Sequence, residues 1–147
     1  MYREIVVGTD GSPAALHAVD HAIHLAAQNS GRLHIVMAYR PLTPDEIYAH
    51  QRGLPPDRRA EVDEAYVARS VLAAAADHAG EVGVPSDVYA RPGHPASAIL
   101  DVAEEVNADL VVVGNRSTKE GKRFMLGDVP SKVSHHCHCH LLIVHLP

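Results

Sequence analysis

Long apolar runs are missing from this sequence of 147 residues. No run approaches the roughly 18 apolar residues that a membrane helix needs, so we expect no membrane span. Basic residues are not in excess either. The formal net charge is −5 at pH 7, which argues against a dedicated nucleic-acid-binding protein. Hydrophobic residues nevertheless make up 46% of the chain, which is ordinary for a globular domain with a buried core.

Cysteine is scarce, and the two thiols, Cys137 and Cys139, are one residue apart. A disulfide between such close neighbours would be strained, so we expect reduced thiols and a reducing compartment. The N-terminus enters a β-branched run at Ile5 without the charged-then-apolar pattern of a signal peptide. We therefore expect a cytoplasmic protein.

Short β-branched runs alternate with segments of helical periodicity along the chain. Proline and charged residues between 40 and 60 predict a variable loop. The alternation predicts one α/β domain over residues 1–147, with a parallel, doubly wound, Rossmann-like sheet and helices on both faces. Strands are expected at 5–7, 33–38, 87–90, 110–113 and 141–144, and helices at 14–28, 60–81, 95–106 and 129–136.

Loops rich in glycine follow the first and fourth predicted strands. One is Gly8-Thr9-Asp10-Gly11-Ser12, and the other runs from Gly114 through Gly127-Asp128. In open parallel sheets, ligands bind beyond the carboxyl ends of the strands, where the strand order reverses. Glycine permits close backbone approach, and helix N-termini present N–H groups to anions. The same residues are also ordinary turn formers, so a purely structural role stays open.

Four segments of the chain form a familiar set. They are the opening Gly-Thr-Asp-Gly-Ser at 8–12, Arg-Pro-Gly-His-Pro-Ala at 91–96, Asp-Leu-Val-Val-Val-Gly-Asn at 109–115 and Leu-Gly-x-Val-Pro-x-Lys-Val at 126–133. Together they resemble the universal stress protein family over nearly the whole chain. The resemblance implies a five-stranded parallel sheet of order 3-2-1-4-5 and a homodimer paired through the last strand. It also implies a stress-response signalling module that binds an adenine nucleotide (ATP, AMP or a cyclic nucleotide), with Mg²⁺ as a further candidate cofactor.

The resemblance assigns ligand roles by position. It places Asp10 near the ribose, and Thr9 and Ala38 near the adenine. Val113 lies beside the base, and residues of the second loop border the phosphates. The complete set of nucleotide-binding residues that the resemblance implies is Gly8, Thr9, Asp10, Ala38, Val113, Gly114, Arg116, Ser117, Gly127, Asp128 and Val129.

Two positions depart from the family's ATP-binding pattern of Gly, two residues, Gly, nine residues, then Gly-Ser or Gly-Thr. Ser117 replaces the second glycine, and Asp128 replaces the hydroxyl residue. We expect Asp128 to cap the last helix and to repel an anion, which lowers affinity by about one to three decades. A ligand with less phosphate charge than ATP, such as AMP or a cyclic nucleotide, is one interpretation. The alternative is a dimeric interaction protein that keeps the fold, has lost the nucleotide and acts on an unknown protein partner.

Every side chain from His135 to His140 is an imidazole or a thiol. Zn²⁺ and Cu(I) prefer such ligands, but the spacing is too tight for one short segment to surround an ion easily. In the family this stretch links the last helix to the last strand. We therefore assign no metal ligand here and keep a metal-responsive role as the third alternative.

The chain has no nucleophile elbow, no Walker A loop and no His-Glu-x-x-His helix. We assign no catalytic residue, and the resemblance implies at most slow ATP hydrolysis.

Overall fold

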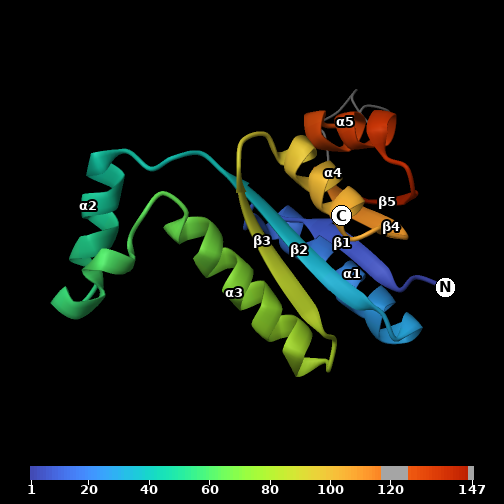
Figure 1. Cartoon of the computed structure of the whole chain (residues 1–147), viewed down its shortest axis with the longest axis horizontal. Coiled ribbons are helices and arrows are strands. Elements are labelled where there is room, and N and C mark those ends of the chain that lie inside the picture. The colour runs from blue at the N-terminus through green and yellow to red at the C-terminus, as the bar shows by residue number, and fades with distance from the viewer. Residues whose placement is uncertain (117–125, 146–147) are drawn as a thin grey trace.

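Five parallel strands form one sheet in the order β3-β2-β1-β4-β5 (Figure 1). The computed structural model describes residues 1–116 and 126–145. This arrangement confirms the expected doubly wound sheet and its strand order. The strands are β1 (Glu4–Gly8), β2 (Arg32–Tyr39), β3 (Ser86–Pro92), β4 (Leu110–Asn115) and β5 (His140–His145).

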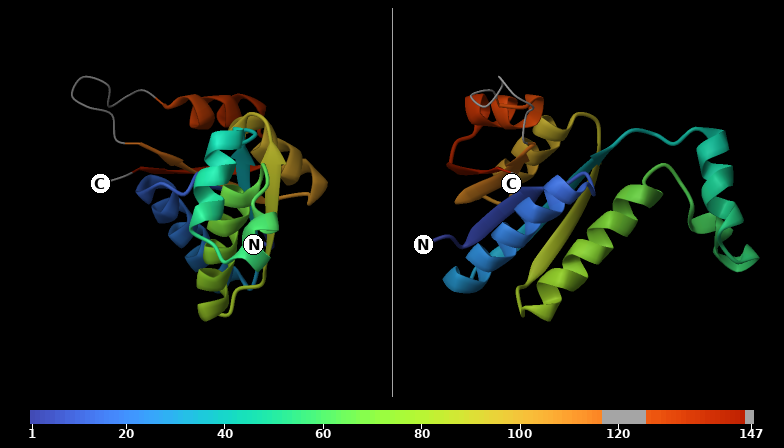
Figure 2. Two further views of the ribbon diagram at one scale, coloured as in Figure 1. Left: turned by 90° about the vertical axis from the view of Figure 1, so that its left-hand side faces the viewer. Right: turned by 180° about the vertical axis from the view of Figure 1, so that it is seen from behind.

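Helices cover both faces of the sheet (Figure 2). Successive side chains of a strand point to opposite faces, and β1 shows this alternation clearly. Ile5 and Val7 pack with α1 (Pro13–Asn29) and α3 (Tyr66–Glu81), whereas Val6 packs with α4 (Pro95–Glu105) and α5 (Asp128–His136). All three β1 side chains are fully buried, so the central strand contributes to both cores.

Residues 40–60 differ from the predicted loop. They contain α2 (Pro44–Arg52) and the start of a 3-10 helix, η1 (Pro56–Glu61). The Glu46 N–H donates to the Thr43 hydroxyl, and the Thr43 N–H donates to the Glu46 carboxylate, which completes a capping box with Pro44 at the first helical position. The prolines begin helical turns here instead of interrupting them. As a result α3 begins at Tyr66, later than the predicted residue 60.

The segment formed by α2 and η1 projects away from the sheet (Figures 1 and 2). No residue of α2 is buried, and Tyr48 on this helix is 62% exposed. None of the helices in the described part of the chain is long and apolar enough to cross a membrane.

Gly31 lies where the chain turns from α1 into β2, against the backbone of residues before β1. A Cβ atom at this position would lie 2.6 Å from the carbonyl oxygen of Tyr2 and 3.2 Å from that of Arg3. Only glycine fits without moving the backbone, so the turn depends on this residue.

We expect Gly31→Ala to lower the free energy of unfolding by about 1–3 kcal/mol, because the added methyl group overpacks against rigid backbone. Gly80→Ala in α3 is the matched control: a Cβ there meets nothing within 4 Å. It should raise stability by up to about 1 kcal/mol through helix propensity. Urea unfolding followed by circular dichroism measures both, and effects of the same sign would contradict this account.

Candidate functional site

A pocket of about 400 Å³ opens at the carboxyl ends of β1 and β4, where the strand order reverses. Residues from loops far apart in sequence line it. Ser117 lies outside the described residues, and the other ten predicted positions all line this one pocket. These ten are Gly8, Thr9, Asp10, Ala38, Val113, Gly114, Arg116, Gly127, Asp128 and Val129.

Asp10 connects the two loops across the pocket mouth. The Ser12 N–H donates to one carboxylate oxygen (2.9 Å), and the Arg116 guanidinium donates to the other (2.9 Å). Partial burial works to raise the pKa of Asp10, but the hydrogen bonds from Ser12 and the charge of Arg116 outweigh it and lower the pKa. The carboxylate is therefore ionised at neutral pH.

Thr9 stabilises the turn that follows β1. Its backbone N–H donates to the Val36 carbonyl (2.9 Å), and its hydroxyl accepts from the Gly11 N–H (3.1 Å). Gly11 has φ of +80°, a conformation that favours glycine. The turn then delivers Ser12, whose hydroxyl caps α1 by accepting from the Ala15 N–H (3.2 Å).

Helix packing explains two of the predicted ligand glycines. A Cβ atom on Gly8 would overlap Cδ1 of Ile99 in α4. On Gly114 it would lie 3.3 Å from the Ala14 carbonyl oxygen and 3.5 Å from Cβ of Ala18, both in α1. These glycines thus let helices approach β1 and β4 from opposite faces, whatever the pocket binds.

Asn115 is a residue that the sequence reasoning quoted within a motif but did not assign to the site. It is 4% exposed, and its Oδ1 accepts the Gly127 N–H (2.9 Å). This bond joins the end of β4 to the start of α5 across twelve positions of sequence. In the sequence, only its position directly after Gly114, at the end of a buried strand, could have indicated that Asn115 belongs to the site.

Asp128 does not cap α5, contrary to prediction. Gly127 is the N-cap residue, and none of the described side chains caps this helix end. The Asp128 carboxylate instead lies 3.1 Å from Nε2 of His94 and 3.4 Å from Nζ of Lys132. The pKa of Asp128 is lowered, and the hydrogen bond from His94 is the largest cause. Desolvation acts in the opposite direction, and Lys132 lowers the pKa further. At the first helical position the carboxylate is one residue too late to cap, and its contacts with His94 and Lys132 hold it to one side.

His94 shapes the start of α4. Its Nδ1 accepts the Ala96 N–H (3.1 Å), so the proton of the neutral ring is on Nε2, which donates to Asp128. Pro95 of α4 and the first residues of α5 both line the pocket. Because helix N-termini carry partial positive charge and N–H groups without intrahelical acceptors, this end of the pocket suits an anion.

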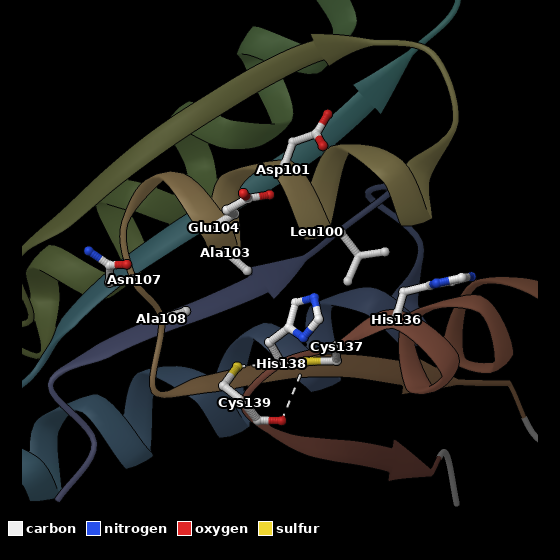
Figure 3. A pocket seen from close by; sticks show the side chains of 10 residues that line it. All are labelled: Leu100, Asp101, Ala103, Glu104, Asn107, Ala108, His136, Cys137, His138 and Cys139. Atoms are coloured by element: carbon white, nitrogen blue, oxygen red, sulfur yellow. Dashed lines mark hydrogen bonds between the residues drawn. The ribbon is translucent and has the colours of Figure 1, made fainter.

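A second pocket, of about 440 Å³, lies between the later part of α4 and the α5–β5 connection (Figure 3). Cys137 and Cys139 are free thiols on its wall. Burial, then the hydrogen bond and charge of Cys137, raise the pKa of Cys139 to about 12. Within residues 1–116 and 126–145, no three His, Cys, Asp or Glu side chains are arranged to hold a metal ion.

Comparison with known proteins identifies the family. Residues 1–145 match the universal stress protein family, and the chain belongs to it. Universal stress protein Rv1636 of Mycobacterium tuberculosis is 36% identical over 148 residues, covering 98% of this chain and 97% of that protein. Universal stress protein YxiE of Bacillus subtilis is 31% identical over 150 residues, covering 98% and 99%. A crystal structure of a universal stress protein in complex with cAMP is similar with a TM-score of 0.69, at 34% identity, covering 98% and 97%.

We expect Asn115→Ala to destabilise the protein by about 1–3 kcal/mol, because the Gly127 N–H loses its acceptor. Asn115→Asp keeps the accepting oxygen but buries a carboxyl group, so it should cost less at acidic pH, where that group is neutral, than at neutral pH. Ser134→Ala, at an exposed hydroxyl of α5 that bonds the Ser131 carbonyl, is the control and should change stability by less than about 0.5 kcal/mol. Urea unfolding measures all three, and equal effects of the two alanine variants would show that the Asn115 contact is dispensable.

Proposed function

We propose that this universal stress protein binds an adenine nucleotide in the pocket between β1 and β4, and that it prefers AMP or a cyclic nucleotide over ATP. The observation that carries the proposal is the convergence of ten predicted ligand positions on one pocket at the topological switch point. A relative 34% identical to this chain is in complex with cAMP, which supports the proposed ligand class. In this proposal the protein is a stress-response signalling module that works through nucleotide binding and not through catalytic turnover.

The two ends of the pocket differ in chemistry in the way that a nucleotide requires. Ala38, Val113 and Ile99 provide an apolar wall on which a purine packs. Asp10 stands at the mouth as an ionised acceptor for ribose hydroxyl groups. The N-terminal turn of α5 supplies the backbone N–H groups of Asp128 and Val129 to a phosphate, since the Gly127 N–H is donated to Asn115.

Asp128 governs how much phosphate charge the pocket accepts. Because its side chain is turned toward His94 and Lys132, it leaves the N–H groups of α5 to a ligand. It still places a carboxylate beside the phosphate position, and each added phosphate group increases the repulsion. Mg²⁺ enters this proposal only with ATP, since the ion binds mainly through the phosphate oxygens of a nucleotide.

Calorimetry of the nucleotide-free protein with cAMP, AMP and ATP, with and without Mg²⁺, tests the proposal. We expect micromolar binding of cAMP or AMP and weaker binding of ATP. If a folded protein binds none of the three, the nucleotide function is wrong, and the chain is an interaction protein that keeps the fold.

Asp128→Ser should raise the affinity for ATP roughly three- to tenfold and that for cAMP by less, because repulsion of an exposed carboxylate is partly screened. Asp101→Ser is the matched control, since it removes the same charge from the second pocket of the same face. Equal gains from both variants would indicate a general charge effect and would exclude a specific role for Asp128.

We further propose a cytoplasmic homodimer that pairs through β5. This strand is at the sheet edge and pairs only with β4 among the described residues, and its Leu141, Leu142 and Ile143 are half-buried. The two free thiols suit a reducing compartment.

Sedimentation analysis should therefore give the mass of two chains, and Leu142→Lys should shift the equilibrium toward one chain. Val88→Lys on the opposite edge strand, at a side chain that is 45% exposed, should leave the dimer intact. A monomer in the unaltered protein, or dissociation by both variants alike, would count against pairing through β5.

A further inference from the structure

The second pocket lies at the opposite ends of the same two helices that contribute to the nucleotide pocket. Its lining comes from α4 beyond Leu100 and from residues 136–139, which lead from α5 to β5 (Figure 3). The nucleotide function does not use these residues. The histidine-cysteine run at 135–140 therefore has a location in the structure without an assigned role.

The sulfur atoms of Cys137 and Cys139 converge at this pocket. Cys137 follows α5 in an extended conformation, and the chain then bends at residues 138 and 139, which brings the two cysteine side chains together. The two Sγ atoms are 3.6 Å apart (Figure 3). Their other contacts are weak: Cys137 Sγ lies 3.5 Å from the Cys139 carbonyl oxygen, and Cys139 Sγ lies 3.6 Å from that of His140. Both side chains are half-buried, so they are sheltered and still accessible.

The 3.6 Å distance between the two sulfur atoms is close to the distance that two sulfur ligands of one metal ion have. With metal–thiolate bonds of about 2.3 Å, two sulfurs on one ion are about 3.8 Å apart at a tetrahedral angle and about 4.6 Å apart in a linear arrangement. A small rotation of the two side chains opens 3.6 Å to either value. The short chain link, which would strain a disulfide, is no obstacle to this longer span.

The surrounding charges favour a cation. Both α4 and α5 end beside the pocket, and helix C-termini carry partial negative charge. Asp101 and Glu104 add two carboxylates to the α4 side. The electrostatic preference is thus opposite to that of the nucleotide pocket, where the same helices begin.

We propose that Cys137 and Cys139 bind one Cu(I) ion as a pair of thiolates. Thiolates are soft ligands that select Cu(I), an ion that is satisfied by few ligands. Structural zinc takes four protein ligands, and in the described chain no third ligating side chain joins the two sulfurs. Binding replaces the two S–H bonds by two Cu–S bonds and releases two protons, with no change in oxidation state.

An anaerobic titration of the reduced full-length protein with Cu(I), against a colorimetric Cu(I) chelator of known affinity, tests the site. We expect one equivalent bound per chain in competition with the chelator, and loss of that equivalent in the Cys137→Ser, Cys139→Ser double variant. Serine is nearly isosteric with cysteine, and circular dichroism verifies that the variant is folded. The control variant His17→Gln, His21→Gln removes a neighbouring imidazole pair on α1, with ring centroids 4.9 Å apart, and should retain the ion.

X-ray absorption at the copper edge should show two sulfur scatterers. Any of three results would overturn the proposal: no stoichiometric Cu(I) in the reduced protein, retention of the ion by the double cysteine variant, or a copper shell of nitrogen and oxygen alone. If the reduced protein fails to bind Cu(I) but loses two hydrogens on mild treatment with peroxide, the pair is a redox couple instead. The nucleotide titrations use the other pocket, so either proposal can fail without the other.

Discussion

The burial of β1 on both faces is the constraint on which the rest of the structure depends. Ile5, Val6 and Val7 leave no polar surface, so one helical layer must cover each face. The strand pairs with β2 on one side and with β4 on the other, in parallel with each. The chain therefore leaves the carboxyl edge in opposite directions, and the loops after β1 and β4 separate to form a pocket. Gly8 lets Ile99 of α4 approach closely at that edge, where both residues line the pocket.

The helices α4 and α5 run in the same direction along one face of the protein. Their N-termini give one end of that face a partial positive charge, and their C-termini give the other end a partial negative charge. Both helices begin beside the pocket at the carboxyl edge and end beside the second pocket. A phosphate at the beginning and a cation at the end are each favoured by the same peptide dipoles. The fold thus supplies the sign of the charge at both proposed sites, and individual side chains refine it. In the two proposals, Asp128 sets the charge of the anion at one end, and the thiols of Cys137 and Cys139 take a soft cation at the other.

The differences between prediction and structure have identifiable physical causes. The helix α2 was predictable from its capping box, Thr43 to Glu46, and the error came from giving the prolines more weight than the cap. The orientation of Asp128 was not predictable in this way. A local preference favoured capping, but His94 is the N-cap residue of α4, and its position relative to Asp128 depends on how α4 and α5 pack. The ten described positions that the family resemblance assigned to a ligand line one pocket, because the loops after β1 and β4 bring most of them to the same edge of the sheet.

The sequence by itself determined the class of fold, the alternation of buried strands and helices, and the set of residues at the carboxyl edge. The fold class and the alternation follow from periodicity, and the residues at the carboxyl edge follow from the positions that the family resemblance implies; both are properties of the chain read in order. Only the tertiary structure decided that Asn115 holds Gly127, that Asp128 faces His94, and that the sulfurs of Cys137 and Cys139 point at each other. Each of these contacts depends on how a side chain is oriented toward a partner that the fold places beside it. Such orientations are selected by packing between layers, and local preferences along the chain do not contain that information.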